Sequence, residues 1–243
     1  MKTIRQVVAI GLGLVLAALV PGHGRAQTWT KSSPGGGGAF TCVDMSSNGT
    51  VLVGSDLSGL YKRESSSGGW TRIGHSDGIK ATAVDAVKWK PGDNNVALTG
   101  TRNGLYRTTN GGSSWSEVSG GWSSGDDVTA IGWSPTTTST VYVTTITSGT
   151  STTFSLWKST DSGASFSAYT HGIASGRRIV KILVDPKVSD GEKIYVVSGR
   201  DQGLAGNKEI YVADNGGTFT KLRLAATTTR STWPSIRRTA NSS

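Results

Sequence analysis

The chain has 243 residues, a formal net charge of +9 and a single cysteine, Cys42. One cysteine excludes an intramolecular disulfide framework, so the packing of apolar side chains has to stabilise the fold. Of the 25 basic residues, three lie in residues 1–26 and four follow Leu222, which leaves 18 basic against 16 acidic side chains in residues 27–222. Because basicity belongs to the ends and no basic face with interleaved aromatic residues is present, we expect no nucleic-acid partner.

Residues 1–26 have the pattern of a secretory signal peptide. Lys2 and Arg5 precede an apolar run over residues 7–20, and small residues surround Arg25. The run is shorter than the roughly 20 residues that a membrane-spanning helix needs. We therefore expect cleavage before Gln27 and a secreted protein, extracellular or periplasmic, that has no membrane attachment afterwards.

Residues 27–222 contain four similar units. Each unit has short runs of β-branched and aromatic residues, separated by Gly, Pro, Asn and Ser, and each ends in a polar turn closed by an aromatic residue. The closing residues are Trp70, Trp115, Phe166 and Phe219, and their numbers differ by 45, 51 and 53. Such runs are typical of strands, and no helical period is visible. Units of this size predict an all-β fold, a β-propeller with about four blades present.

Four blades are few for a propeller, and an open set would leave sheet faces and edges uncovered. We therefore expect an incomplete larger propeller, of seven blades, with the chain as the front portion of a longer protein. A closed ring of four blades is the alternative. Residues 223–243 break the repeat and are rich in Ala, Thr, Ser and Arg, which indicates a disordered or truncated basic tail.

The polar turns resemble the Asp-box, or BNR, repeat. Residues 159–166 read Ser-Thr-Asp-Ser-Gly-Ala-Ser-Phe, and the Asp-box pattern is Ser/Thr-x-Asp-x-Gly-x-Ser/Thr-Trp/Phe. A carboxylate or amide accepts backbone N–H groups within such a turn, and glycine permits a left-handed residue. We assign these turns a structural role. The assigned residues are Asn110, Trp115, Asp161, Gly163, Phe166, Asp214, Gly216 and Phe219.

Two segments near the start carry a more specific resemblance. Residues 33–40 read Ser-Pro-Gly-Gly-Gly-Gly-Ala-Phe, and residues 53–62 read Val-Gly-Ser-Asp-Leu-Ser-Gly-Leu-Tyr-Lys. This pair resembles the opening of glycoside hydrolase family 74, the xyloglucan-active endo-β-1,4-glucanases, and the resemblance extends over roughly residues 33–222. It implies inverting hydrolysis by two aspartates. Asp56 matches the general base, whereas a later propeller domain supplies the acid, so the resemblance implies that this chain alone is inactive.

A comparison between the chain's own units also singles out Asp56. The second unit repeats the segment as Gly-Thr-Arg-Asn-Gly-Leu-Tyr-Arg over residues 100–107, without a carboxylate at the matching place. A blade therefore does not require an acid there, which indicates a local task for Asp56; the alternative is an aspartate that caps the loop between strands.

The glycine run has two interpretations, a close backbone approach to a polysaccharide or a flexible linker. As substrate-binding candidates we name Gly37, Gly38, Tyr61 and Trp122, the last in a Gly-Gly-Trp-Ser-Ser-Gly loop that would present an aromatic platform.

The expected partner is thus a polysaccharide, a β-glucan such as xyloglucan, bound by a monomer. We expect no cofactor and no metal, because no His, Cys and Asp set has metal-ligand spacing. The alternative is a non-catalytic secreted Asp-box propeller that binds protein or glycan, as sortilin-like and photosystem-assembly-factor-like proteins do. Asp56 with the glycine run favours the hydrolase, and the missing second carboxylate favours the binding protein.

Overall fold

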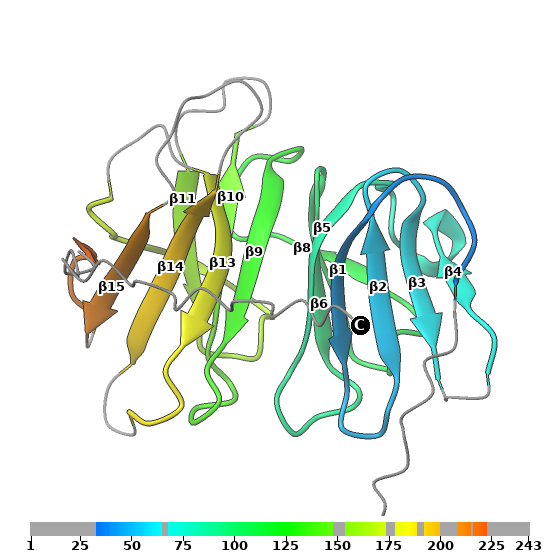
Figure 1. Ribbon diagram of the computed structural model, residues 1–243, viewed down its shortest axis with the longest axis horizontal. Coiled ribbons are helices and arrows are strands. Elements are labelled where there is room, and N and C mark those ends of the chain that lie inside the picture. The colour runs from blue at the N-terminus through cyan, green and yellow to red at the C-terminus, as the bar shows by residue number, and fades with distance from the viewer. Residues whose placement is uncertain are drawn as a thin grey trace, which may run out of the picture. The chain divides into compact units, whose positions relative to one another are not determined.

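The computed structural model describes residues 33–64, 68–147, 154–173, 178–188, 192–199, 209–214 and 216–222. Within these ranges the chain forms four antiparallel sheets of four strands each (Figure 1). The predicted all-β propeller fold with four blades is confirmed. The predicted signal peptide and basic tail lie outside the described residues.

Each blade is one sheet whose strands follow one another in the chain. The first blade has β1 (Phe40–Met45), β2 (Val51–Ser55), β3 (Gly59–Arg63) and β4 (Thr71–Ile73), followed by the short helix η1 (His75–Asp77). The second has β5 (Val84–Trp89), β6 (Ala97–Thr101), β7 (Gly104–Thr108) and β8 (Ser116–Val118). The third has β9 (Asp127–Trp133), β10 (Val141–Ile146), β11 (Phe154–Ser159) and β12 (Ser167–Tyr169). The fourth has β13 (Arg178–Val184), β14 (Lys193–Gly199), β15 (Ile210–Asp214) and β16 (Thr220–Lys221).

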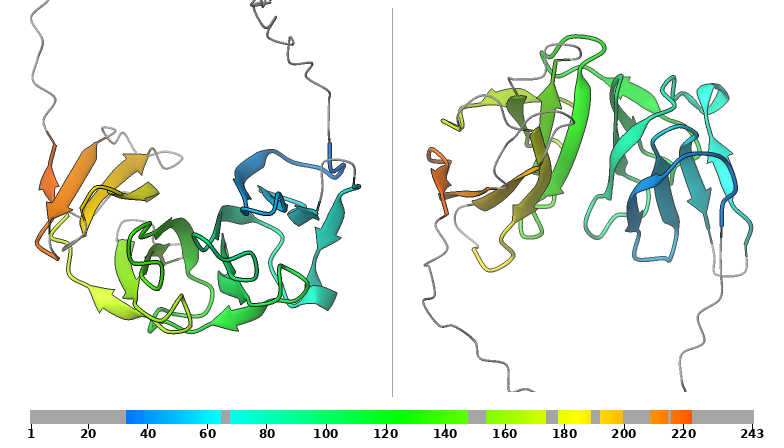
Figure 2. Two further views of the ribbon diagram at one scale, coloured as in Figure 1. Left: turned by 90° about the horizontal axis from the view of Figure 1, so that it is seen from below. Right: turned by 45° about the horizontal axis from the view of Figure 1, so that its top comes forward.

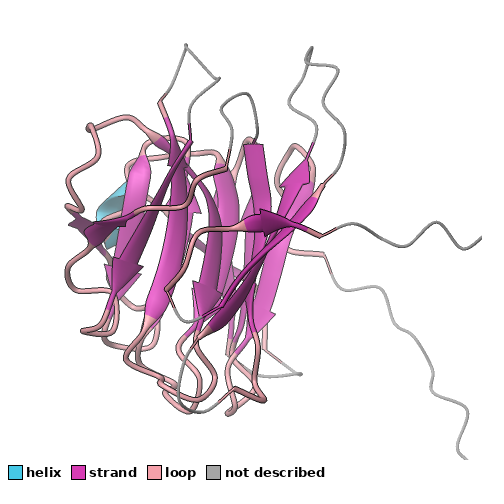
Figure 3. Cartoon of the chain, turned by 90° about the vertical axis from the view of Figure 1, so that its left-hand side faces the viewer, coloured by secondary structure: helices cyan, strands magenta, loops and turns pink. Residues whose placement is uncertain are grey.

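The blades stack in chain order, as Figure 2 shows. The first strands of successive blades contact one another, β1 with β5, β5 with β9 and β9 with β13. Figure 3 shows how far strands dominate the described part of the chain, with η1 as its short helical turn. Because successive side chains along a strand point to opposite faces, each sheet has a leading face toward the preceding blade and a trailing face toward the following one.

A β-bulge recurs at the same place in the first strand of every blade. The pairing register shifts at Thr41, Asp85, Thr129 and Val180, which aligns the four blades residue by residue. The bulge residue also links neighbouring blades. Thr41 donates its hydroxyl hydrogen to the carbonyl of Val84, and Thr129 donates to the carbonyl of Ile179 over 2.7 Å. The bulge thus both bends the strand and joins it to the next blade.

The hydrophobic core lies between the sheets, in three clusters that each join two successive blades. Small residues on the trailing faces let the next blade approach closely. A Cβ atom on Gly54 would lie 2.6 Å from Cγ1 of Val84, and one on Gly100 would lie 2.7 Å from Cγ1 of Val128. Leading-face residues such as Val84 are fully buried as a result. Burial of this apolar surface is the main stabilising contribution of the stack.

The polar turn of the third blade closes through Asp161. Its Oδ1 accepts the backbone N–H groups of Ala164 at 3.0 Å and Ser165 at 2.9 Å, and the hydroxyl of Ser159 at 2.7 Å. Burial raises the pKa of the Asp161 carboxyl, but the hydrogen bonds from Ser165 and Ser159 outweigh it and lower that pKa to about 2. Gly163 has a φ of +77°, and a Cβ there would lie 2.9 Å from Leu98 of the second blade. The turn therefore also packs against the preceding blade.

The corresponding turns of the second and fourth blades differ in their contacts. Asn110 reproduces the pattern, since its Oδ1 accepts the N–H of Ser114 at 3.0 Å and the hydroxyl of Thr108 at 2.9 Å. In the fourth blade the carboxylate of Asp214 lies 3.1 Å from Nζ of Lys193. The closing aromatic residues Trp115 and Phe219 are both buried.

Candidate functional site

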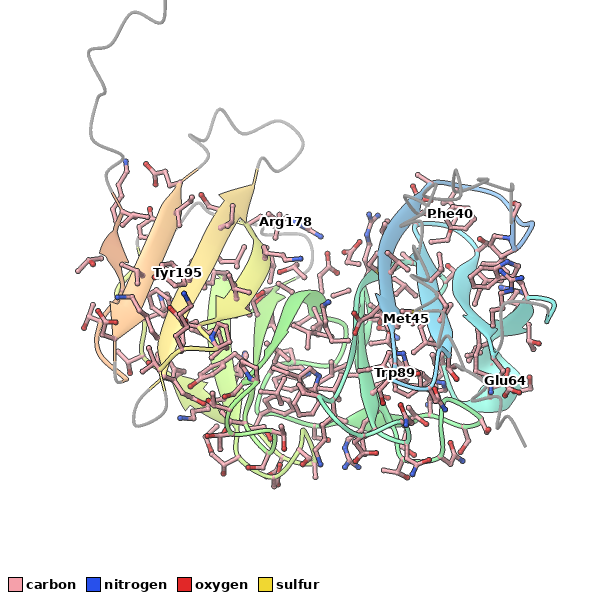
Figure 4. The ribbon with its side chains drawn as sticks, turned by 60° about the horizontal axis from the view of Figure 1, so that its bottom comes forward. Phe40, Met45, Glu64, Trp89, Arg178 and Tyr195 are labelled. Atoms are coloured by element: carbon pink, nitrogen blue, oxygen red, sulfur yellow. The ribbon has the colours of Figure 1, made fainter. Side chains whose placement is uncertain are left out.

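Asp56, the catalytic residue predicted from the sequence, lies at one edge of the sheets. Because the strands are antiparallel, the start of each first strand and the turn between the second and third strands lie at the same edge. Asp56 occupies this turn in the first blade, and Arg102 occupies it in the second. Figure 4 shows Phe40 and Arg178 at this edge and Met45 toward the other end of β1.

One backbone–backbone hydrogen bond and one backbone–side-chain hydrogen bond join the Asp56 turn to Ala39. The N–H of Asp56 donates to the carbonyl of Ala39 over 3.0 Å, and the carboxylate Oδ1 accepts the N–H of Ala39 at 2.7 Å. Asp56 is half-buried. Among the described residues, Ala39 is the one hydrogen-bond donor to this carboxylate, and it donates to Oδ1.

The glycine run packs onto this turn. The carbonyl of Gly37 accepts the hydroxyl groups of Ser55 at 3.1 Å and Ser58 at 2.8 Å. Gly38 has a φ of +88°, and a Cβ atom there would lie 2.2 Å from Oδ1 of Asp56. Of the two sequence interpretations, close approach by the backbone therefore describes the run, but the surface approached is the chain's own Asp56 turn.

Tyr61 lies beneath the run, whereas Trp122 lies at a different place. Tyr61 is 4% exposed, and its ring meets that of Phe40 edge to face with centroids 6.5 Å apart. Trp122 is half-buried and meets Trp157 and Phe166 edge to face, at 5.3 Å and 5.4 Å between centroids. The structure thus brings Asp56, the glycine run and Tyr61 together and leaves Trp122 in the packing of the third blade. Direct substrate contact by either ring stays a prediction.

The same edge carries a charged cluster that sequence reasoning missed. Nη2 of Arg178 lies 2.7 Å from Oδ2 of Asp85, and Nη1 lies 3.9 Å from Oδ2 of Asp127. Nε of Arg102 lies 3.5 Å from the same oxygen of Asp85. Burial raises the pKa of the Asp127 carboxyl above its ordinary value, although the Arg178 charge opposes this shift. No spacing in the sequence could reveal this cluster, because Asp85 and Arg178 are 93 positions apart in the chain.

A cavity of about 290 Å³ lies between β1, β5, β9 and β13, next to this cluster. Its lining combines polar side chains, such as Thr41, Asp85 and Lys88, with apolar ones, such as Val87 and Ile131. Cys42 also lines it, and burial raises the pKa of its thiol to about 11, which keeps the thiol protonated near neutral pH.

The described residues at this edge supply carboxylates, guanidinium groups, hydroxyl groups and backbone. No group of three His, Cys, Asp or Glu side chains suited to a metal ion occurs among the described residues. None of the helices in the described part of the chain has the length and apolar character needed to cross a bilayer. Asp85 and Asp127 face Arg178, whereas Asp56 forms no ion pair with a described residue.

The sequence comparison and the structure comparison both match xyloglucanase-type enzymes. No protein-family model matches the chain. A xyloglucanase of Hypocrea jecorina (strain QM6a) is 28% identical over 205 residues, which cover 74% of this chain and 23% of the xyloglucanase. The resemblance to family 74 xyloglucanases is thereby confirmed as a similarity of sequence.

Solved structures of the same family share the fold. The family 74 enzyme of Niastella koreensis matches with a TM-score of 0.57 and 19% identity over 75% of this chain and 30% of its own. An ancestral family 74 enzyme matches with a TM-score of 0.56 and 18% identity over 81% of this chain and 32% of its own. A chain of the COPII outer coat vertex matches with a TM-score of 0.54 and 16% identity, covering 77% and 51%. The chain therefore spans about a third or less of the family 74 proteins it matches.

Proposed function

We propose that this chain is a glycan-directed propeller of the glycoside hydrolase type, exported from the cell, whose Asp56 acts as the general base in inverting hydrolysis of a β-glucan such as xyloglucan. The supporting observation is the geometry of Asp56. Ala39 N–H holds one carboxylate oxygen, the other accepts no hydrogen bond from the described residues, and a glycine run packs against the turn. The sequence similarity to a xyloglucanase points to the substrate class.

In this reaction Asp56 would take a proton from a water molecule. The water oxygen attacks the anomeric carbon, and the glycosidic bond breaks as an acid protonates the leaving oxygen. The N–H of Ala39 fixes the orientation of the carboxylate, so the base needs little reorganisation during the step. The acid would come from outside the described residues, since Asp85 and Asp127 pair with Arg178.

The same pairing favours a second candidate, a non-catalytic propeller that binds glycan or protein. Asp85 and Asp127 at this edge both face the guanidinium group of Arg178, so their ion pairs account for them without a catalytic role. A propeller edge with charged and aromatic side chains can bind a sugar chain without cleaving it. This candidate predicts glycan or protein binding and no hydrolysis.

Two measurements separate the candidates. Titration calorimetry of the purified chain with xyloglucan oligosaccharides tests binding, and release of reducing ends by the complete product of the gene tests hydrolysis. We expect Asp56→Asn to retain binding and to lower hydrolysis by about 10³-fold, the range of a lost general base. Asp185→Asn is the matched control, because Asp185 also accepts one backbone N–H, from Lys187, but follows the other end of β13. If the Asp56 variant and the wild type hydrolysed xyloglucan equally, the catalytic assignment of Asp56 would be wrong. If the wild type did not bind the oligosaccharides, xyloglucan would not be the ligand.

A further inference from the structure

A basic residue recurs at one position of the third strand in the first three blades. The pairing registers align Lys62 of β3, Arg107 of β7 and Lys158 of β11. In the first blade Nζ of Lys62 lies 2.9 Å from Oε1 of Glu64. In the third blade Nζ of Lys158 lies 3.1 Å from Oε2 of Glu192, which precedes β14. At both of these places the basic residue is therefore part of an ion pair.

The second blade departs from this repeat. No carboxylate of the described residues forms an ion pair with Arg107, and Thr109 stands where the first blade has Glu64. The Nε–H of Arg107 donates to the carbonyl of Ser162, in the polar turn of the third blade, over 2.9 Å. Its two Nη groups donate to no described residue. The guanidinium group is thus fixed in position, but its charge has no ion-pair partner in the described part of the chain.

Arg107 lines a cavity of about 430 Å³ at the seam between the second and third blades. Residues with hydroxyl groups form much of the lining, and Ala164 of the third blade completes it. The hydroxyl residues are Thr109, Ser114, Ser116 and Ser119. The volume lies within the range of small-molecule sites, about 300–1,000 Å³. Both walls belong to adjacent blades among the described residues, so the cavity does not involve the exposed end faces of the stack.

Two acidic residues of this region leave the charge of Arg107 unpaired. Glu117 also borders the cavity, but successive side chains of a strand point to opposite faces, so its carboxylate and the side chain of Ser116 lie on different faces of β8. In agreement, a Cβ atom on Gly104 would lie 3.6 Å from Oε1 of Glu117. The carboxylate of Asp161 is held by hydrogen bonds within its own turn. The cavity therefore combines one fixed positive charge with hydroxyl groups.

We propose that this cavity binds a ligand that carries a carboxylate group beside hydroxyl groups, of the uronic acid class. A planar guanidinium group matches a carboxylate through two parallel N–H···O bonds, so the ligand supplies the partner that Glu64 supplies in the first blade. The hydroxyl groups of the lining can donate to and accept from the ring hydroxyls of such a sugar. The site does not depend on the proposed function. It lies by the turn between β7 and β8, at the opposite edge of the sheets from Asp56.

Titration of the purified chain with sodium glucuronate tests the site, followed by the NMR resonance of the Arg107 Nε–H group. One guanidinium contact and a few hydroxyl contacts predict a Kd of about 1 mM, so the titration extends to about 50 mM. Glucose is the matched neutral sugar, and sodium chloride controls for ionic strength. We expect a saturable shift with glucuronate. We expect glucose to bind about tenfold more weakly or less tightly still, because hydrogen bonds to charged groups contribute about that factor or more.

Substitutions of Thr109 test the role of the unpaired charge. Thr109→Glu places a carboxylate where the first blade has Glu64, so it is expected to pair with Arg107 and to weaken glucuronate binding about tenfold or more. Thr109→Gln is the matched neutral variant of the same length, and it is expected to keep the wild-type Kd within about threefold. Neither substitution alters the donor or acceptor of the Arg107–Ser162 bond, so the contact between the blades is retained.

Four results would overturn the proposal. The first is the absence of a saturable shift with glucuronate, and the second is equal binding of glucose, since the guanidinium group would then not select the ligand. The third is an equal loss of binding in Thr109→Glu and Thr109→Gln, which would mean that the threonine and not the charge of Arg107 holds the ligand. The fourth is tighter binding of sodium phosphate than of glucuronate, which would show that the cavity takes phosphate groups instead of carboxylates.

Discussion

Replacement of Gly38 by alanine tests how the glycine run supports Asp56. At a φ of +88° an alanine costs roughly 1–2 kcal/mol. Its Cβ would also lie 2.2 Å from Oδ1 of Asp56 and 2.9 Å from Cβ of Leu57. Either the carboxylate or the run must then move by about 1 Å, which breaks the 2.7 Å bond from Ala39 N–H. At this half-exposed position that bond is worth about 1 kcal/mol.

Together these effects predict a loss of about 2–3 kcal/mol in the local stability of the run. The assay is hydrogen exchange of the Ala39 amide, which we expect to accelerate about 30- to 160-fold at 1.36 kcal/mol per factor of ten. Gly37→Ala is the control, because a Cβ there meets nothing within 4 Å. If both variants exchanged Ala39 at the same rate, the run would not be holding the carboxylate and the argument for a positioned base would fail.

Three further predictions concern charged groups. Arg178→Met leaves the Asp85 carboxylate, 9% exposed, without its closest partner. We expect a loss of about 2–3 kcal/mol in the free energy of urea unfolding. Adding Asp85→Asn should restore part of this loss. If the double variant lost the sum of the two single-variant losses, Asp85 and Arg178 would not be paired. Burial lowers the pKa of His171, which stacks on Phe154 at 4.4 Å, so the fold favours the neutral imidazole. Stability should therefore fall as the pH drops below about 6.5, by no more than about 1.4 kcal/mol per pH unit, with a shallower pH dependence in His171→Gln. The pKa of Asp161 is lowered to about 2, so its contribution to stability is present above about pH 4 and is lost as the pH falls toward 2. In acid unfolding followed by tryptophan fluorescence, Asp161→Asn should show less of this loss. An unchanged acid transition would mean that the Asp161 carboxylate does not stabilise the fold through its turn.

The repeat in the sequence was sufficient to predict the fold. Strand-forming runs and turn residues act locally, and a unit of about 50 residues that cannot bury its apolar face alone has to stack on its neighbours. The blade containing Asp161 shows this most clearly, because the residues that close its turn lie within seven positions of one another. Local pattern and global stack therefore agree, and the sequence carries both.

The site was predictable only in part. The contrast between Asp56 and Arg102 singled out the carboxylate, since it compares equivalent positions of two units. Sequence alone could not show that Gly38 packs against Asp56 instead of a ligand. A flexible linker and a segment whose backbone packs closely on another surface are both rich in glycine. It could not place Trp122 in the third blade's packing, because exposed and half-buried loop tryptophans have the same local pattern.

What the sequence by itself determined is therefore the class of fold, the number of units and one carboxylate that its sister unit lacks. Only the tertiary structure decided that Arg178 meets Asp85 and that Val43 and Leu183 stand exposed at the two ends. The physical reason is the same in each case. Local pattern specifies how a residue behaves within its own sheet, whereas its partners on the next sheet depend on strand register and stacking, which bring together residues far apart in the chain.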